Sequence, residues 1–207
     1  MSPTFLVFFS MLAAFLLLTL AAVMRWVWHL YRPPRQSAAI GVANPEEASA
    51  LTDGLLLVGV ATAWYSVAMG WGGQFTAYPI YADLARVGPE AFRAFGHGYL
   101  SRVAVVLLPL GVMCLAWGLL LWLPDPNVPR RTVWAIVGLC VAFVAVTPFA
   151  ATAQSQMQAQ GFSEALYARL MWSNAIRSLL FTAIGVLSLA AVRSRWTITR
   201  SNHERGT

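Results

Sequence analysis

The sequence has few charged residues and no lysine. Only 11% of its 207 residues are charged, and all 14 basic residues are arginine. A soluble globular domain carries about 25% charged residues, so this composition excludes an ordinary soluble domain. Hydrophobic residues make up 58% of the chain, and the mean hydropathy is +0.63. The balance is typical of a protein with a large lipid-facing surface.

Metal-ligating and nucleophilic motifs are scarce as well. The chain has three histidines and two cysteines, without a CxxC, HxH, HxxxH or ExxH spacing and without a GxSxG motif. Because metal and haem centres need several such ligands close together, we expect no metal and no cofactor. Cys114 and Cys140 each lie in the middle of an apolar run, and we interpret both as small apolar residues of the core.

Five apolar segments account for most of the chain. They cover residues 5–23, 55–69, 103–123 and 133–149, and a last segment that ends at residue 192. A helix needs roughly 20 residues to cross a hydrocarbon core of about 30 Å. The first and third segments reach that length by themselves, and the others reach it if their polar flanks enter the membrane. The absence of an internal repeat argues against a transporter built from inverted repeats.

The first segment has the flanks of an uncleaved membrane anchor. Nothing basic precedes Phe5, whereas Arg25, Arg32 and Arg35 follow the segment. A signal peptide has the opposite asymmetry, and arginines collect on the cytoplasmic side of a membrane. The segments between successive spans alternate between the two sides of the membrane, which puts nine arginines in cytoplasmic segments and five in external ones. We therefore expect a multi-pass protein of an inner (plasma) membrane, with its N-terminus outside and its C-terminus inside.

The expected fold class is all-α: a four-helix transmembrane bundle preceded by one N-terminal transmembrane helix. Residues 1–28 would form the anchor, 29–53 a cytoplasmic linker, 54–193 the bundle and 194–207 a basic cytoplasmic tail. The arginines lie at the ends of apolar segments and form no continuous basic stripe. The expected partners are therefore membrane lipids and not nucleic acid.

A proline-started helix precedes the third segment and contains the candidate catalytic histidine. Residues 87–90 (VGPE) have the pattern of a turn followed by a helix start. Helical spacing from there places Phe92, Phe95 and Tyr99 on one side of the helix. His97 stands between two glycines, and its ordinary pKa of about 6.5 suits proton abstraction near neutrality.

Tyrosines and arginines complete this candidate site. Tyr78 or Tyr99 could donate a hydrogen bond to a bound molecule, and Arg102 or Arg177 could stabilise an oxyanion such as an enolate. The alternative is an interfacial His97 surrounded by aromatic belt residues and by arginines that extend toward water.

The last segment is too short to cross a membrane without its polar flank. From Ser178 to Val192 there are 15 residues, or about 22 Å of helix. About five more residues are needed to span the hydrocarbon core, which brings Asn174 and Arg177 inside the membrane boundary. Arg177 either extends to the surface or lines a polar pocket with Asn174, whose side chain shares its helix face.

Three short motifs resemble the anthrone-oxygenase-like family of small membrane proteins. They are residues 73–80 (GQFTAYPI), 89–99 (PEAFRAFGHGY) and 172–178 (WSNAIRS), accompanied by Arg102-Val103 and Leu108-Pro109-Leu110. The resemblance covers residues 55–192 and leaves the first segment as an addition. Members often have an apolar-proline-polar element after the third family helix, where this chain has residues 148–154 (PFAATAQ).

The resemblance implies a four-helix bundle and, from a few fungal members, cofactor-independent oxidation of anthrones to anthraquinones. Carried onto this chain, it points to a catalytic set and a surrounding binding set: His97, Asn174 and Arg177, with Tyr78, Tyr99 and Arg102.

Two functions remain open at this stage. The first is a membrane protein with an outward-facing polar pocket for a small aromatic or lipid-like molecule, with deprotonation by His97 as the reaction if it is an enzyme. The second is a non-catalytic accessory or assembly subunit of a larger membrane complex. The glycine-rich end of the second segment and the additional N-terminal span suit helix–helix contact with such a partner.

Overall fold

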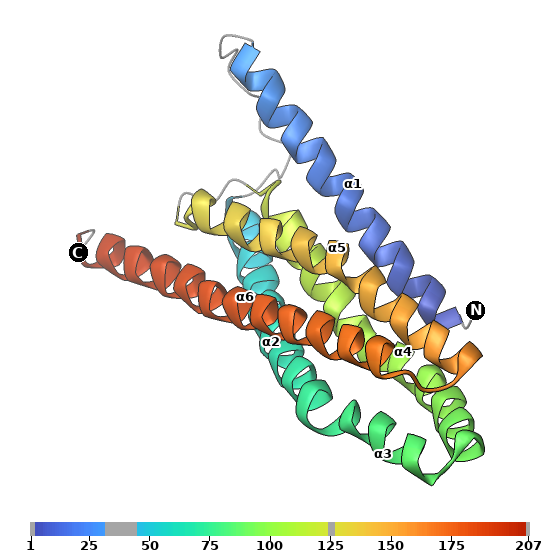
Figure 1. Cartoon of the computed structure of the whole chain (residues 1–207). Coiled ribbons are helices and arrows are strands. Elements are labelled where there is room, and N and C mark those ends of the chain that lie inside the picture. The colour runs from blue at the N-terminus through green and yellow to red at the C-terminus, as the bar shows by residue number, and fades with distance from the viewer. Residues whose placement is uncertain (1–2, 32–44, 124–126, 206–207) are drawn as a thin grey trace.

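The computed structural model describes residues 3–31, 45–123 and 127–205, and all the elements within these ranges are helices (Figure 1). In chain order they are α1 Pro3–Tyr31, α2 Pro45–Gly72, the π-helix η1 Gly73–Ala77, α3 Pro79–Val87, α4 Pro89–Leu120, α5 Arg130–Gln160 and α6 Glu164–Arg205. The predicted all-α fold is confirmed.

The long helices have the character of membrane spans. Four stretches are long and apolar enough to cross a membrane, namely Leu6–Arg25, Ser49–Val87, Arg130–Gln160 and Glu164–Thr197. A shorter apolar stretch, Val105–Leu120, lies within α4. These lengths and compositions are those of a multi-pass membrane protein.

Prolines and glycines decide where several helices begin and end. Pro45, Pro79 and Pro89 each open a helix, which suits proline because the first turn needs no backbone N–H donor. Gly88 and Gly161 follow the ends of α3 and α5 with φ values of 144° and 94°, which favour glycine. The predicted start at Pro89 is confirmed, and α4 continues from it into the apolar segment without a break.

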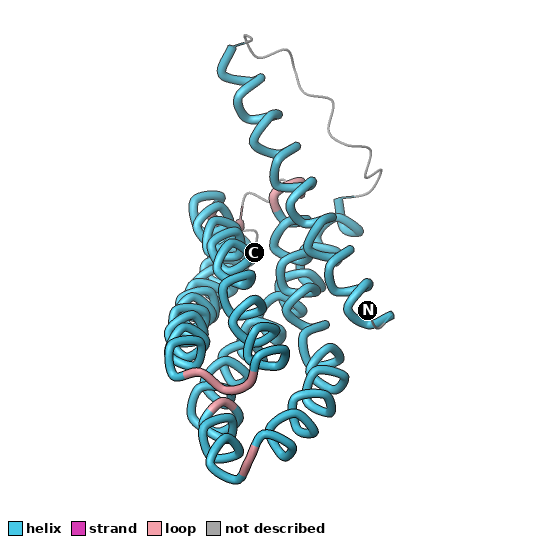
Figure 2. Tube along the Cα trace, turned by 45° about the vertical axis from the view of Figure 1, so that its right-hand side comes forward, coloured by secondary structure: helices cyan, strands magenta, loops and turns pink. Residues whose placement is uncertain are grey.

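Helices α2, α4, α5 and α6 form the bundle, in which each helix packs against two neighbours. Helix α1 packs against α4, and the end of α1 away from the N-terminus stands clear of the other helices (Figure 2). The buried Phe15 lies over Gly118, where an added Cβ would come within 3.1 Å of its ring. Cys114 and Cys140 are free thiols in the same apolar core.

An aromatic cluster joins α3 to α4 at one end of the bundle. Tyr81 of α3 is fully buried, and its ring makes edge contacts with Phe92, Phe95 and Tyr99 at centroid distances of 5.8, 5.4 and 5.9 Å. Its hydroxyl accepts a 2.6 Å hydrogen bond from the Gln154 amide of α5. The predicted shared face of the three α4 aromatics is therefore confirmed, and it holds α3 against the bundle.

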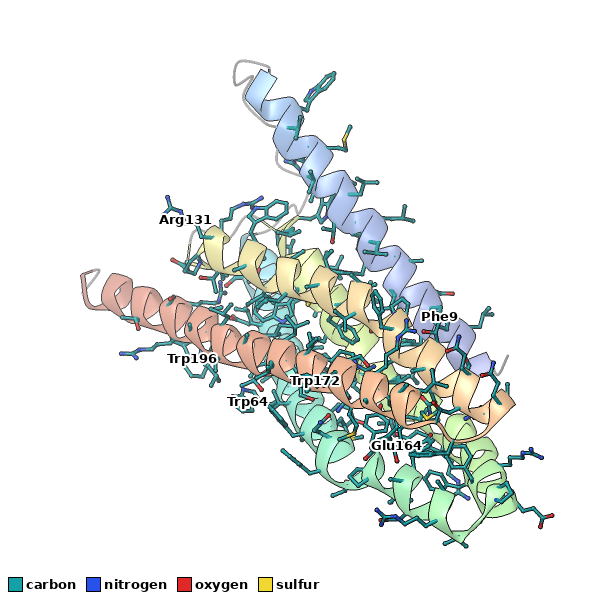
Figure 3. The ribbon with its side chains drawn as sticks, in the orientation of Figure 1. Phe9, Trp64, Arg131, Glu164, Trp172 and Trp196 are labelled. Atoms are coloured by element: carbon teal, nitrogen blue, oxygen red, sulfur yellow. The ribbon has the colours of Figure 1, made fainter. Side chains whose placement is uncertain are left out.

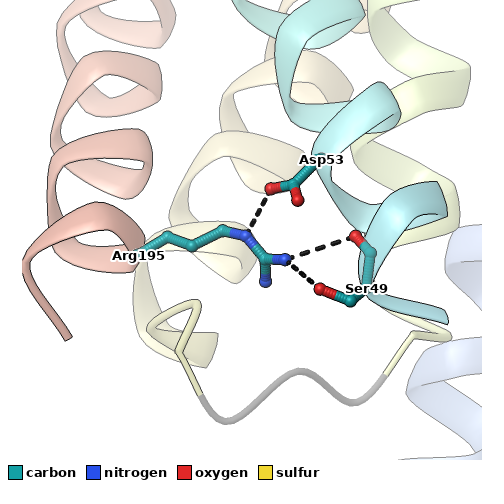
Figure 4. A network of polar contacts seen from close by, with 3 residues as sticks. All are labelled: Ser49, Asp53 and Arg195. Carbon is teal, nitrogen blue, oxygen red and sulfur yellow. Dashed lines mark hydrogen bonds and ion pairs between the residues drawn. The ribbon is translucent and has the colours of Figure 1, made fainter. Parts of the chain in front are cut away.

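An ion pair between a buried arginine and a partly exposed aspartate joins α2 to α6 at the opposite end (Figure 4). Arg195 is 4% exposed, and its Nε donates a 2.5 Å hydrogen bond to the Asp53 carboxylate. Its Nη2 donates to the hydroxyl of Ser49 at 2.9 Å and to the carbonyl of Ser49 at 3.2 Å. A buried cation of this kind is stable because a carboxylate and neutral oxygens surround it.

Large aromatic side chains lie on the outer surface of the bundle (Figure 3). Trp172 and Trp196 of α6 are 72% and 70% exposed, and Trp64 of α2 is also exposed. Exposed tryptophans near both ends of α6 are typical of a helix whose ends meet two membrane interfaces.

The close approach of α2 to α6 depends on Gly70. A Cβ at this position would lie 2.8 Å from the Ser178 hydroxyl and 3.3 Å from the Ser178 Cα. Gly70→Ala is therefore expected to lower the free energy of unfolding by about 1–3 kcal/mol through overpacking. Thermal unfolding in detergent micelles measures this. Gly54→Ala in the same helix is the control, because no atom lies within 4 Å of its added Cβ. Equal melting temperatures for the two variants would contradict the packing argument.

Candidate functional site

A cavity of about 610 Å³ lies between α2 with η1, α4 and α6. Pockets that hold a small molecule have volumes of about 300–1,000 Å³. Its polar lining side chains come from all three sides: Thr76 and Tyr78, Tyr99 and Arg102, and Asn174 and Arg177. The apolar lining comes from Met69, Ala77, Ala94, Phe95, Val103, Val106, Leu107, Leu110 and Phe181, with glycines 70, 72, 73 and 98 between them.

The π-helix η1 forms one wall of the cavity. Its wide turn is closed by the Tyr78 N–H, which donates to the Gly73 carbonyl five residues earlier at 2.9 Å. Such a turn interrupts the regular α-helical hydrogen bonds and recurs at functional sites. It also brings Tyr78, which is 9% exposed, onto the cavity wall.

Asn174 connects the two helices behind this wall. Its side chain is 5% exposed, and its Nδ2 donates to the Gly70 carbonyl at 3.1 Å and to Gln74 Oε1 at 2.9 Å. Its Oδ1 accepts a 3.0 Å hydrogen bond from Arg177 Nη2. Both amide hydrogens and the carbonyl oxygen are therefore used, so the side chain has one stable orientation.

Arg177 brings a positive charge to the cavity without an acidic partner among the described residues. Its Nη2 also donates to the Tyr78 hydroxyl at 3.3 Å, and its Nε is buried without a hydrogen-bond partner. The cavity lining contains no Asp or Glu. Arg177 is half-buried, and a partly desolvated cation held by neutral oxygens alone is costly. A buried donor without an acceptor adds to that cost. The local electrostatics therefore favour an anion in the cavity.

The cavity changes from polar to apolar along α4. Tyr99 and Arg102 are the polar lining residues of α4, and Arg102 is exposed at the cavity's edge. Beyond them, Val103, Val106 and Leu110 form an apolar wall. The arrangement can bind an oxygen-bearing head group at the arginines and an apolar body beside the wall.

The structure brings five of the predicted site residues to this one cavity. They are Tyr78, Tyr99, Arg102, Asn174 and Arg177. The side chain of His97 lies outside the described residues, and its backbone belongs to α4 between the lining residues Phe95 and Gly98. The predicted common face of Asn174 and Arg177 is confirmed by their hydrogen bond.

Sequence reasoning missed two residues that support the site. Gln74 accepts a hydrogen bond from Asn174, and Gly70 offers both the space and the carbonyl for the same amide. The glycine-rich stretch of residues 70–73 was the available signal. It predicts close helix packing or a helix break, and the structure shows close packing at Gly70 and a π-turn just after it.

Comparison of the chain with protein-family models, with curated proteins and with solved structures finds no match. The resemblance to the anthrone-oxygenase-like family and the roles that it implies for His97, Asn174 and Arg177 therefore remain predictions.

Replacing Asn174 tests whether its amide holds the cavity wall together. Asn174→Leu retains a similar volume but leaves the Gly70 carbonyl and Arg177 without their partner. We expect a loss of about 1–3 kcal/mol in unfolding free energy, the cost of buried polar groups left unpaired. Chemical denaturation in micelles measures it, with the exposed Gln156→Leu of α5 as the control. A neutral effect of Asn174→Leu would show that the network contributes nothing to the fold.

Proposed function

We propose that the protein binds, in this cavity, a small and largely apolar molecule with an anionic or enolisable oxygen group. The molecule is aromatic or lipid-like. The observation that carries this proposal is the half-buried Arg177, which lines a cavity without a carboxylate and whose hydrogen bonds go to neutral oxygens. The second arginine of the lining, Arg102, adds positive charge at the cavity's edge. The apolar wall accommodates the remainder of the ligand.

The proposed topology has five spans in an inner (plasma) membrane, with the N-terminus outside and the cavity toward the outside. It is supported by the arginine distribution of nine against five. The course of the helices agrees, because the start of α2 and the ends of α4 and α6 lie toward one end of the bundle, and α3 lies at the other (Figure 1). We assign the fifth span to α4, which contains the shorter apolar stretch Val105–Leu120 and whose 32 residues extend about 48 Å in all.

The proposed reaction at this site is cofactor-independent oxidation of an anthrone-type substrate. His97 would remove a proton from the carbon opposite the ring carbonyl. Arg177 and Tyr99 would stabilise the negative oxygen that results. The carbanion then reacts with O₂: one oxygen atom becomes the new carbonyl, the other leaves as water, and the CH₂ group has become C=O. The choice of substrate rests on the resemblance. The stabilisation of its negative oxygen rests on the positive charge of Arg177 in the cavity.

The alternative of a non-catalytic accessory subunit has less support. The glycine-rich end of α2 was one reason to expect a partner protein, yet Gly70 packs against Ser178 and Phe181 of the same chain. The exposed apolar residues of α1, such as Leu17 and Met24, suit lipid as well as they suit a protein. We therefore retain ligand binding as the proposed function.

Binding of an aromatic anion tests the role of Arg177. 9-Anthracenecarboxylate is expected to bind the protein in nanodiscs, and Arg177→Met to weaken it at least about 10-fold, since a hydrogen bond to a charged group contributes about 1.5–3 kcal/mol. Ligand fluorescence measures the affinity. The affinity for the neutral 9-anthracenemethanol should change less than about 3-fold in Arg177→Met. Arg193→Met, at an exposed position of α6, is the matched control variant. Unchanged affinity of the anion for Arg177→Met contradicts the proposal.

Turnover tests the role of His97 separately. His97→Ala should abolish formation of anthraquinone from anthrone, followed by absorbance and oxygen uptake, because the base that removes the proton is gone. Retained binding of 9-anthracenecarboxylate and an unchanged helical circular dichroism spectrum show that the variant is folded. If the variant turns over as fast as the original protein, His97 is not the base.

A further inference from the structure

The polar residues of the cavity share one depth in the membrane. Asp53 of α2 and Arg195 of α6 form an ion pair at one end of the bundle, and α4 ends close to Trp122. We take Asp53, Arg195 and Trp122 as the level of one membrane interface. A hydrocarbon core is spanned by roughly 20 residues of helix, and counting that number along α2, α6 and α4 leads to residues 73, 175 and 102. Gln74, Asn174 and Arg102 stand at or beside these positions. Three helices therefore place the polar part of the cavity at a membrane interface.

The apolar part of the cavity lies deeper in the bilayer. From Arg102 the wall continues along α4 through Val103, Val106 and Leu110. These positions run toward the middle of the apolar stretch Val105–Leu120. Eight residues of helix correspond to about 12 Å, so the cavity extends from the depth of lipid head groups to the depth of lipid chains.

The mouth of the cavity lies between α2 with η1 on one side and α4 on the other. The exposed lining residues are Met69, Thr76, Ala94 and Arg102, all from α2 with η1 or from α4. The lining residues of α6 are buried or half-buried. Met69 is 39% exposed. It lies five residues before Gln74, so Met69 is about 7 Å deeper in the bilayer than the interface. The opening between α2 and α4 therefore reaches the depth of lipid chains.

We infer that the natural ligand is a single-chain anionic amphiphile that enters from the adjacent lipid leaflet between α2 and α4. Its carboxylate or similar oxyanion binds Arg177 and Arg102, and its chain lies along residues 103–110. An extended polypeptide advances about 3.6 Å per residue over three backbone bonds, or about 1.2 Å per bond. We take the same advance for an extended hydrocarbon chain, so a wall of about 12 Å suits roughly ten carbons. The inference rests on the proposed binding function, narrows its ligand to the lipid-like class, and is an alternative to the proposed oxidation of an anthrone-type substrate.

Competition with 9-anthracenecarboxylate in nanodiscs tests the ligand class. Dodecanoate should displace the probe, acetate should be at least 100-fold weaker because it lacks the chain, and dodecanol at least 10-fold weaker because it lacks the charge. Arg177→Met should remove the preference for dodecanoate over dodecanol, and Arg193→Met should retain it. Probe binding without displacement by dodecanoate overturns this inference and leaves the proposed function standing. Absence of probe binding overturns the proposed function itself, and equal affinities for dodecanoate and dodecanol overturn the role of the anionic head.

Spin labels test lateral entry from the lipid leaflet. Both native cysteines are fully buried, so Met69→Cys gives a selectively labelled protein. A label at this position should collide with lipid-soluble oxygen as often as one at Leu57→Cys, which is 71% exposed in the middle of α2. Saturation with dodecanoate should lower that collision rate at least 2-fold at position 69 and leave position 57 unchanged. Preferential collision with a water-soluble nickel chelate, as expected for Arg86→Cys on α3, would mean that the mouth opens to water and would overturn lateral entry.

Discussion

The site depends on one contact, the hydrogen bond from the Asn174 amide to the Gly70 carbonyl. It joins residues 104 positions apart in the chain, and it forms only because Gly70 has no side chain to separate α2 from α6. The same amide also binds Gln74 and Arg177. One buried side chain thus sets the spacing of two helices, supports the π-helix and orients the cation of the cavity. Polar groups within a membrane bundle have this influence because few other partners are available to them.

The two arginines of α6 show how structural and functional charges differ. Arg195 meets a carboxylate and two oxygens of Ser49, so its charge and its donors are satisfied within the chain. Arg177 meets the neutral oxygens of Asn174 and Tyr78 and retains a buried Nε without an acceptor. Both lie on α6, but Arg195 faces Asp53 and Ser49 of α2, whereas Arg177 meets Asn174 of its own helix and Tyr78, which follows η1. The partners of Arg195 lie within the fold, whereas Arg177 has no acidic partner among the described residues, and we propose that an anionic ligand supplies one.

The sequence predicts the elements of this fold better than their arrangement. Apolar segments and opening prolines such as Pro89 locate the helices, because helix length and the first turn are local properties. The spacing of Asn174 and Arg177 predicts their common face for the same reason. The π-turn at Gly73–Ala77 and the contact between Gly70 and Asn174 could not be derived, since each depends on packing between distant segments. The docking of α1 on α4 likewise depends on the fit of Phe15 over Gly118, which no local pattern reveals.

We propose that Arg177 is the cation that binds an anionic ligand in the cavity. An electron cryo-microscopy structure of the protein in lipid nanodiscs, determined with saturating dodecanoate, tests it most directly. We expect elongated density between α2 and α4, with its head within hydrogen-bonding distance of Arg177 and its chain beside Val106 and Leu110. An empty or collapsed cavity, or an Arg177 side chain turned away from it toward a carboxylate of the protein, would contradict the account.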